Sequence, residues 1–298
     1  MSESLIIGFE DTAEGRDAVA LGTQLAVALA ATPLLANAVT LPEGVLSVQE
    51  LDAALKAVAA GQLEAPLGGI KQLHPEAQAV AVSAGSAARA LHDLAEQREA
   101  IATVVGSTDR GPLGRVLPGS TAERLLHGAP CAIAVAERGF AEQERRLLRV
   151  GVACDGTREA DLALKAAVKI ARACNSTLDL LSIAQTVDLA YVPAAVAMMP
   201  LSELQATEKR RMREKLDRAL NQVPDELPAH GQLLIGAPGA ALVDVSEEFD
   251  LIVVGSRGYG PLRRTLIGST SRHLFSSAQC SVLAMPRGID PGPFAVGD

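Results

Sequence analysis

The chain contains no tryptophan, and aromatic residues make up only 2% of it, although 48% of its 298 residues are hydrophobic. Ala, Val and Leu must therefore do most of the packing, as is usual in layered α/β folds. No apolar run reaches the roughly 20 residues that a membrane-spanning helix needs. The first residues, MSESLIIGFEDT, also lack the basic and apolar regions of a secretion signal. These absences predict a cytoplasmic protein with no membrane partner.

Cysteine and histidine are sparse and scattered. The four cysteines include no CxxC pair, which argues against a zinc site or a disulfide framework and suits a reducing cytoplasm. The five histidines show no metal-ligand spacing, and no GxSxG motif indicates a Ser–His–Asp set. We therefore expect no metal site and no catalytic residues.

Negative charge is in excess, but only in one half of the chain. Through Arg145 there are 10 basic and 18 acidic residues, whereas from Arg146 onward there are 17 of each, and the net charge is −8. Neither half is basic enough to indicate nucleic acid as the main partner.

The stretch from Leu251 to Arg272, LIVVGSRGYGPLRRTLIGSTSR, carries the clearest functional pattern. Its leading apolar residues predict a strand buried on both faces of a parallel sheet. Glycines at 255, 258 and 268 let the backbone approach an anion, and the hydroxyls at 269–271 predict a helix N-terminus that favours phosphate. Arginines at 257, 263, 264 and 272, with no acid, suit a polyphosphate. The alternative is that the glycines only form turns and the arginines only solvate a surface.

This stretch has a counterpart earlier in the chain. The sequence VVGSTDRGPLGRVLPGSTAERLLHGAPCAIAV begins at Val104 and VVGSRGYGPLRRTLIGSTSRHLFSSAQCSVLA begins at Val253, so equivalent positions lie 149 residues apart. Two copies half a chain apart predict two similar domains and not a solenoid of short units. Cys131 and Cys280 also match, and we expect both to be small buried residues, with a redox role as the alternative.

Strands and helices alternate in each half, which predicts a parallel sheet with helices on both faces. We expect two similar doubly wound, Rossmann-like domains, 1–140 and 146–298, each a five-stranded parallel sheet flanked by about four helices. The expected strands are 5–9, 34–39, 80–82, one around Val104 and 132–135, then 149–154, 178–183, 233–235, 251–254 and 281–284. The charged link near 137–149 is expected to lie outside, and the Gly- and Pro-rich tail after Pro286 to fray.

The motif Gly255-x2-Gly258-x9-Gly268-Ser269 resembles the nucleotide-binding signature of the universal stress protein family, and the resemblance covers nearly all of both halves. It differs from a P-loop because no lysine follows Gly268. The resemblance implies an ATP site, with or without Mg²⁺, in the second half. The implied binding residues are Asp155 near the adenine, Gly156 and Thr157 in the same turn, Ile183 on the purine face, Val254 before the loop, and Gly255, Arg257, Gly258, Gly268, Ser269, Thr270 and Ser271 around ribose and phosphates. Asp155 also suits a helix N-cap, and both roles can coexist.

The first half departs from this pattern. Glu10 stands at the position of the acid, Asp11 replaces the glycine after it, and Asp109 replaces the second loop glycine. Residues 106–123 carry no net charge, whereas residues 255–272 carry +4. Because a carboxylate near the phosphates repels them, we expect the first half to bind ATP weakly or not at all.

Two segments of the second half have open interpretations. The apolar stretch LAYVPAAVAMMP at 189–200 is favoured as a packed loop or a contact with the other half; the alternative is a lid or a partner-docking surface. The following helix, 202–220, contains KRRMREKLDR and is expected to present a solvated face.

The favoured function is an ATP-binding regulatory protein of the stress response. The alternatives are a slow ATPase or nucleotidyl-transfer enzyme of related fold, and a non-binding dimerisation scaffold. No visible general base or pair of metal ligands accompanies the loop, so we expect hydrolysis, where present, to be slow. The last strands, 132–135 and 281–284, would leave apolar edges, and we expect the halves to pair through them as an intramolecular pseudo-dimer, as the resemblance also implies. A further homodimer of whole chains, through 189–200, stays open.

Overall fold

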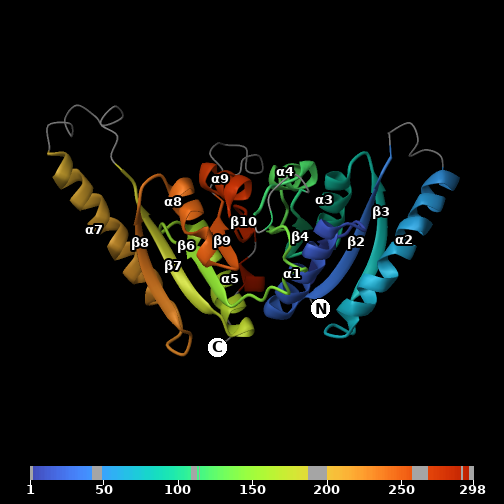
Figure 1. Cartoon of the computed structure of the whole chain (residues 1–298), viewed down its shortest axis with the longest axis horizontal. Coiled ribbons are helices and arrows are strands. Elements are labelled where there is room, and N and C mark those ends of the chain that lie inside the picture. The colour runs from blue at the N-terminus through green and yellow to red at the C-terminus, as the bar shows by residue number, and fades with distance from the viewer. Residues whose placement is uncertain are drawn as a thin grey trace.

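The computed structural model describes residues 3–41, 49–108, 113, 115–186, 200–256, 268–289 and 291–294. Within these residues, ten strands form one continuous sheet in the order β3-β2-β1-β4-β5-β10-β9-β6-β7-β8. Figure 1 shows the two halves side by side, with α2 and α7 at opposite outer ends of the molecule. The predicted doubly wound α/β architecture is confirmed.

Each half repeats the same succession of elements. The first half contains β1 (Ser4–Gly8), α1 (Ala13–Leu29), β2 (Thr32–Thr40), α2 (Gln49–Lys71), β3 (Gln78–Ala84), α3 (Ala87–Gln97), β4 (Ala102–Gly106), α4 (Ser120–Leu126) and β5 (Ala132–Ala136). The second contains β6 (Arg149–Ala153), α5 (Arg158–Cys174), β7 (Thr177–Ala184), α7 (Leu201–Leu220), β8 (Ala229–Ile235), α8 (Pro238–Asp244), η2 (Ser246–Glu248), β9 (Leu251–Gly255), α9 (Ser269–Ser277), β10 (Ser281–Met285) and η3 (Gly292–Phe294). The described part of each half therefore has the five parallel strands and four α-helices that were predicted, although the sequence analysis placed no helix at 49–71.

The first helix of each half begins and ends in the same way. Thr12 caps α1 by accepting a hydrogen bond from the Gly15 amide (3.1 Å), and Thr157 caps α5 by accepting one from the Ala160 amide (3.3 Å). Both helices end on a residue in the left-handed conformation, Ala30 or Asn175. Identical start and stop signals place both helices at the same point of their halves.

Helices cover both faces of the sheet and bury it. One core cluster packs α1, α2, α5 and α7 on one face, with Leu5, Ile7 and Leu283 pointing toward them. The other packs α3, α4, α8 and α9 on the opposite face, with Ile6 and Val282 pointing that way. Alternate residues of one strand thus enter opposite cores, which explains why the central strands are mostly apolar, whereas the edge strands β3 and β8 are partly exposed.

The two halves join through their last strands. β5 and β10 pair antiparallel, with Val135 opposite Val282 and Ala134 opposite Leu283. The Val116 amide adds a hydrogen bond to the Ala278 carbonyl (2.8 Å) beside this seam. The predicted pseudo-dimer through the last strands is confirmed, and the pairing removes two apolar edges at once.

The link between the halves was predicted to lie outside, which is wrong at its beginning. The side chains of Glu137 and Phe140 are completely buried, whereas the stretch 142–144 is exposed. The carboxylate of buried Asp17 accepts hydrogen bonds from the amides of Gly139 and Ala141, both at 2.8 Å, and so fixes the link against α1.

The tail was predicted to fray after Pro286, and for residues 291–294 this is wrong. Phe294 is 1% exposed and belongs to the core cluster beside α5. Lys169 of α5 donates a hydrogen bond from Nζ to the Pro293 carbonyl at 2.8 Å. One buried aromatic ring outweighs the local preference of a Gly- and Pro-rich sequence. None of the helices in the described part of the chain combines the length and apolar character needed to cross a bilayer.

Candidate functional site

A cavity of about 650 Å³ lies at the carboxyl ends of β6, β7 and β9. In this half of the sheet, β6 lies between β7, which follows it in the chain, and β9, which comes later. The strand order therefore reverses between β6 and β9, and open α/β sheets bind ligands in the crevice at such a point. Nine predicted binding residues line the cavity: Asp155, Thr157, Ile183, Val254, Gly255, Gly268, Ser269, Thr270 and Ser271.

The remaining predicted residues lie elsewhere. Gly156 belongs to the same turn but is not part of the cavity wall, and it adopts a φ of +71° under the side chain of Lys215. Arg257 and Gly258 lie outside the described residues, as do Arg263 and Arg264. The segment 189–199 lies outside them too, so the interpretations of 189–200 stay predictions.

The carboxylate of Asp155 stabilises the turn that follows β6. Oδ1 of Asp155 accepts hydrogen bonds from the amide (3.0 Å) and the hydroxyl (2.6 Å) of Thr157. Thr157, and not Asp155, is the N-cap of α5. Nζ of Lys215 donates to the Asp155 carbonyl, which ties α7 to this turn. The proposed N-cap role of Asp155 is therefore replaced by a turn that positions the cap.

Close packing requires glycine at position 255, independently of any ligand. A Cβ at this position would lie 2.5 Å from the backbone of Glu159 in the first turn of α5. The equivalent Gly106 is equally constrained, because a Cβ there would lie 2.1 Å from the carbonyl oxygen of Glu14. Both glycines thus let the first helix of each half approach the strand end, whatever the loop binds.

The N-terminus of α9 faces the same cavity. Gly268 is the N-cap and supplies no side-chain hydrogen bond, while its own amide donates to Oγ of Ser256 at 3.2 Å. Ser271 is 1% exposed, and among the described residues its hydroxyl has no hydrogen-bond partner. Uncapped amides and a buried hydroxyl without a partner can donate to an anionic ligand.

Helix α7 forms a wall of this cavity that the sequence analysis missed. Glu208, Arg211, Met212 and Lys215 all line the cavity, although the helix was expected to present only a solvated face. Met212 and Leu216 are buried against the sheet and turn the neighbouring basic residues toward the cavity. Their i, i+4 apolar spacing within KRRMREKLDR is the signal that could have identified this inward face.

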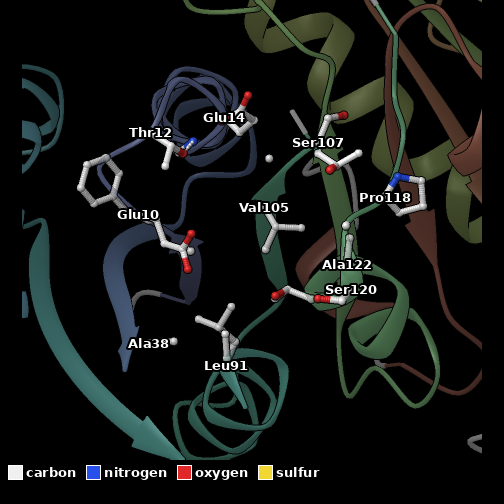
Figure 2. A pocket seen from close by; sticks show the side chains of 18 of the residues that line it. Glu10, Thr12, Glu14, Ala38, Leu91, Val105, Ser107, Pro118, Ser120 and Ala122 are labelled. Atoms are coloured by element: carbon white, nitrogen blue, oxygen red, sulfur yellow. Dashed lines mark hydrogen bonds between the residues drawn. The ribbon is translucent and has the colours of Figure 1, made fainter. Parts of the chain in front are cut away.

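The first half has a cavity in the equivalent place, with nearly the same volume of about 640 Å³ (Figure 2). Ser120 matches Ser269, but Ala122 stands where Ser271 carries its unpartnered hydroxyl. Beside this position, the Thr108 amide donates to the Leu117 carbonyl at 2.8 Å. Among the described residues, the first cavity therefore lacks the hydroxyl that Ser271 offers in the second.

Cysteines 131, 154 and 280 are all buried, as predicted for the first and last of these. Burial raises the pKa of the Cys131 thiol to about 11 and that of Cys154 to about 12, and the pKa of Cys280 lies well above its usual value for the same reason. A protonated thiol is a poor nucleophile, so the packing role is favoured over the redox role.

One group of possible metal ligands occurs among the described residues, on α3. The ligand atoms of His92, Asp93 and Glu96 lie within 4.8 Å of one another on the surface. Nε of Arg89 lies 2.8 Å from the Asp93 carboxylate and already neutralises it. The group has no role in the cavities described above.

Comparison with known proteins agrees with the two-part architecture. A model of the universal stress protein family matches residues 1–137 and 147–286. A universal stress protein of Mycolicibacterium smegmatis is 28% identical over 202 residues, which cover 67% of this chain and 66% of that protein. Universal stress protein MT2698 of Mycobacterium tuberculosis is 27% identical over 301 residues, with 95% of this chain and 96% of that protein covered.

Among solved structures, a universal stress protein from Archaeoglobus fulgidus has a TM-score of 0.68 and covers 97% of this chain with all of its own. At 18% identity this likeness shows the fold alone. The two family matches account for nearly all of the sequence, and their limits coincide with the two halves of the sheet. The chain therefore belongs to the universal stress protein family, of which it contains two domains.

Proposed function

We propose that this protein is an adenine-nucleotide-binding regulator of the stress response that holds ATP in the cavity of its second half. In this proposal the first domain, residues 1–140, carries an altered loop, and the second, residues 146–298, carries the ATP site. Family membership supports the stress-related role. The geometry of the second cavity supports the ligand.

The observation that carries the proposal is the hydroxyl of Ser271. It is buried without a hydrogen-bond partner among the described residues, and it lines the second cavity beside the uncapped N-terminus of α9. A buried donor without a partner costs free energy unless a ligand satisfies it. The first half, which we expect to bind ATP poorly, has Ala122 at this position.

The remaining residues divide the cavity into two ends. Asp155 and Ile183 lie at the ends of β6 and β7 and are proposed to contact the adenine, with Ile183 packing on its face. Gly268, Ser269 and Thr270 at the start of α9 are proposed to contact ribose and phosphates. A volume of about 650 Å³ lies within the range of pockets that enclose ligands of this size.

Charge favours the same assignment. Arg211 and Lys215 of α7 line the second cavity, whereas no basic residue lines the first among the residues described there. Cationic side chains beside helix-terminal amides favour polyphosphate. Mg²⁺ would be bound mainly through the phosphates of ATP, as is common for this ion.

Two measurements on the full chain test the proposal. Heat extraction and chromatography of the purified protein should release adenine nucleotide, and calorimetric titration of the stripped protein should show one ATP site. Ser269→Asp places a carboxylate at the phosphate end and should weaken ATP binding at least about tenfold. The matched control Ser120→Asp makes the same change at the equivalent position of the first half and should leave affinity unchanged.

Equal effects of the two substitutions would contradict an ATP site confined to the second half. A larger effect of Ser120→Asp would place ATP in the first half, and no ATP binding by the native chain would contradict the proposal as a whole. We expect ATP turnover to stay far below the roughly 10 per second of an average enzyme. A steady-state rate near that value would instead favour the alternative of an ATPase.

A further inference from the structure

A smaller cavity adjoins the main cavity of the second half. It encloses about 240 Å³ between α5 and α7, whereas the main cavity encloses about 650 Å³. Three residues line both cavities: Cys154 just after β6, Ala160 in the first turn of α5, and Lys215 of α7. The two cavities are therefore neighbours that share a wall.

Lys215 supplies the long side chain of this shared wall. Ala160 contributes only a methyl group, and Cys154 contributes a short, buried thiol. Nζ of Lys215 donates a hydrogen bond to the Asp155 carbonyl. The methylene groups of Lys215 cover Gly156, where a Cβ would lie 3.2 Å from Cδ of the lysine. The lysine side chain thus extends from α7 to the turn after β6 and is held at its far end, between the two cavities.

The small cavity combines a buried apolar floor with an exposed polar rim. Its apolar lining residues are all buried: Cys154, Ala160, Leu164 and Ala219. Its exposed lining residues are Asp161, Arg218 and Gln222. An apolar cavity of roughly 150 Å³ is large enough to hold a benzene ring. A space of about 240 Å³ with a floor of this kind can therefore accept one aryl group.

We propose that Lys215 sets the size limit at the adenine end of the second cavity, and that the small cavity is an aryl subsite which Lys215 keeps closed. The inference rests on the proposed function, because Asp155, whose carbonyl Lys215 engages, belongs to the end assigned to adenine. With Lys215 in place, the chain selects a purine without a bulky substituent. When this side chain is shortened, the two cavities merge and a purine that carries an aryl group becomes a ligand.

A purely structural role for Lys215 predicts a different outcome. If the lysine only tied α7 to the turn after β6, its loss would weaken the binding of every nucleotide in proportion, because all of them use the same main cavity. A size limit instead changes the ratio of two affinities. The first half offers no equivalent side chain, since no residue of α2 lines its cavity in the part of the chain that the structure describes.

The test compares ATP with two analogues that carry a benzyl group on the base, one on the exocyclic amine and one attached to C8 through an amino group. Calorimetric titrations use the full chain. At least one analogue should bind the native chain about tenfold or more weakly than ATP. In Lys215→Ala, the affinity of a disfavoured analogue relative to that of ATP should rise at least about tenfold. Lys215→Arg keeps the length and the donor and should keep the native ratio.

Two further variants locate the effect. Arg211→Ala is the matched control, because Arg211 lines the main cavity and not the small one. It should weaken the binding of ATP and of both analogues alike and leave the affinity ratios unchanged. Ala219 lines only the small cavity, so adding Ala219→Leu to Lys215→Ala fills that space and should cancel the gain.

The outcomes separate this inference from the proposed function. If the native chain binds both analogues as tightly as ATP, or if the ratios in Lys215→Ala stay at their native values, the inference is wrong and the ATP site stands. A gain that persists after Ala219→Leu would place the benzyl group outside the small cavity and overturn the subsite. A native chain that binds no ATP would overturn the proposed function and this inference together.

Discussion

Glu137, at the seam between the halves, should make the stability of this protein depend on pH. Its side chain is fully buried just after β5, and Nε of Arg145 lies 3.1 Å from its Oε1. Among the described residues, neither carboxylate oxygen accepts a hydrogen bond. Burial raises the pKa of Glu137 from 4.5 to about 7; Arg145 opposes this shift, and the nearby Asp250 and Asp17 add to it.

The sign and size of the effect follow from that pKa. The folded state holds the Glu137 proton more tightly than the unfolded state does. The contribution of Glu137 to the free energy of unfolding is therefore most favourable below pH 4.5. It is lost as the pH rises from 4.5 to about 7 and is constant above that range. At 1.36 kcal/mol per pKa unit, the full loss is roughly 3 kcal/mol. A neutral glutamine at this position cannot ionise, so Glu137→Gln should abolish this part of the pH dependence.

Because the chain has no tryptophan whose fluorescence could report unfolding, the effect is measured by urea denaturation monitored by far-UV circular dichroism. The free energy of unfolding of the native chain, minus that of Glu137→Gln, should fall by roughly 3 kcal/mol between pH 4.5 and pH 8. Asp17, whose pKa burial also raises, is present in both proteins and largely cancels in this difference. The control Glu142→Gln changes an exposed acid of the same link and should give a flat difference. A flat difference for Glu137→Gln as well would refute the reasoning.

Three other substitutions test the seam, the cavity wall and the glycine at the strand end. Leu283→Lys buries a charge at the centre of β10 and should lower the free energy of unfolding by at least about 3 kcal/mol, while Leu283→Met should cost less than about 1.5 kcal/mol in the same urea experiment. Arg211→Glu should weaken ATP binding about tenfold, as measured by calorimetry, whereas Arg210→Glu, on the exposed face of α7, should not. Equal losses of ATP affinity in the two variants would show that α7 acts only through long-range charge. Gly255→Ala should lower the melting temperature even without nucleotide, because the new Cβ would lie 2.5 Å from the backbone of Glu159. An unchanged melting temperature would show that α5 can move away from the end of β9 without loss of stability.

Much of the architecture could be predicted because local sequence patterns indicate it. Apolar runs flanked by glycine and threonine marked β6 and β9 and the start of α5 nearly to the residue. The repeat at a spacing of 149 residues fixed the number of domains, since two copies of one pattern must fold alike. The pairing of β5 with β10 followed from an apolar edge that needs a cover. Each of these inferences uses residues that are close together in the chain.

What the sequence alone determined is therefore the order of elements apart from α2, the two-fold repeat and the nine predicted residues that line the second cavity. The tertiary structure decided which groups have partners. Contacts between distant segments left the Ser271 hydroxyl without a partner among the described residues, placed α7 at the cavity and buried Glu137 beside Arg145. Burial and pairing depend on what packs against a residue from elsewhere in the chain. The local spacing of Met212 and Leu216 indicates that α7 has an inward face, but it does not identify what that face contacts. The different charged lining of two cavities with nearly equal volume arises in this way.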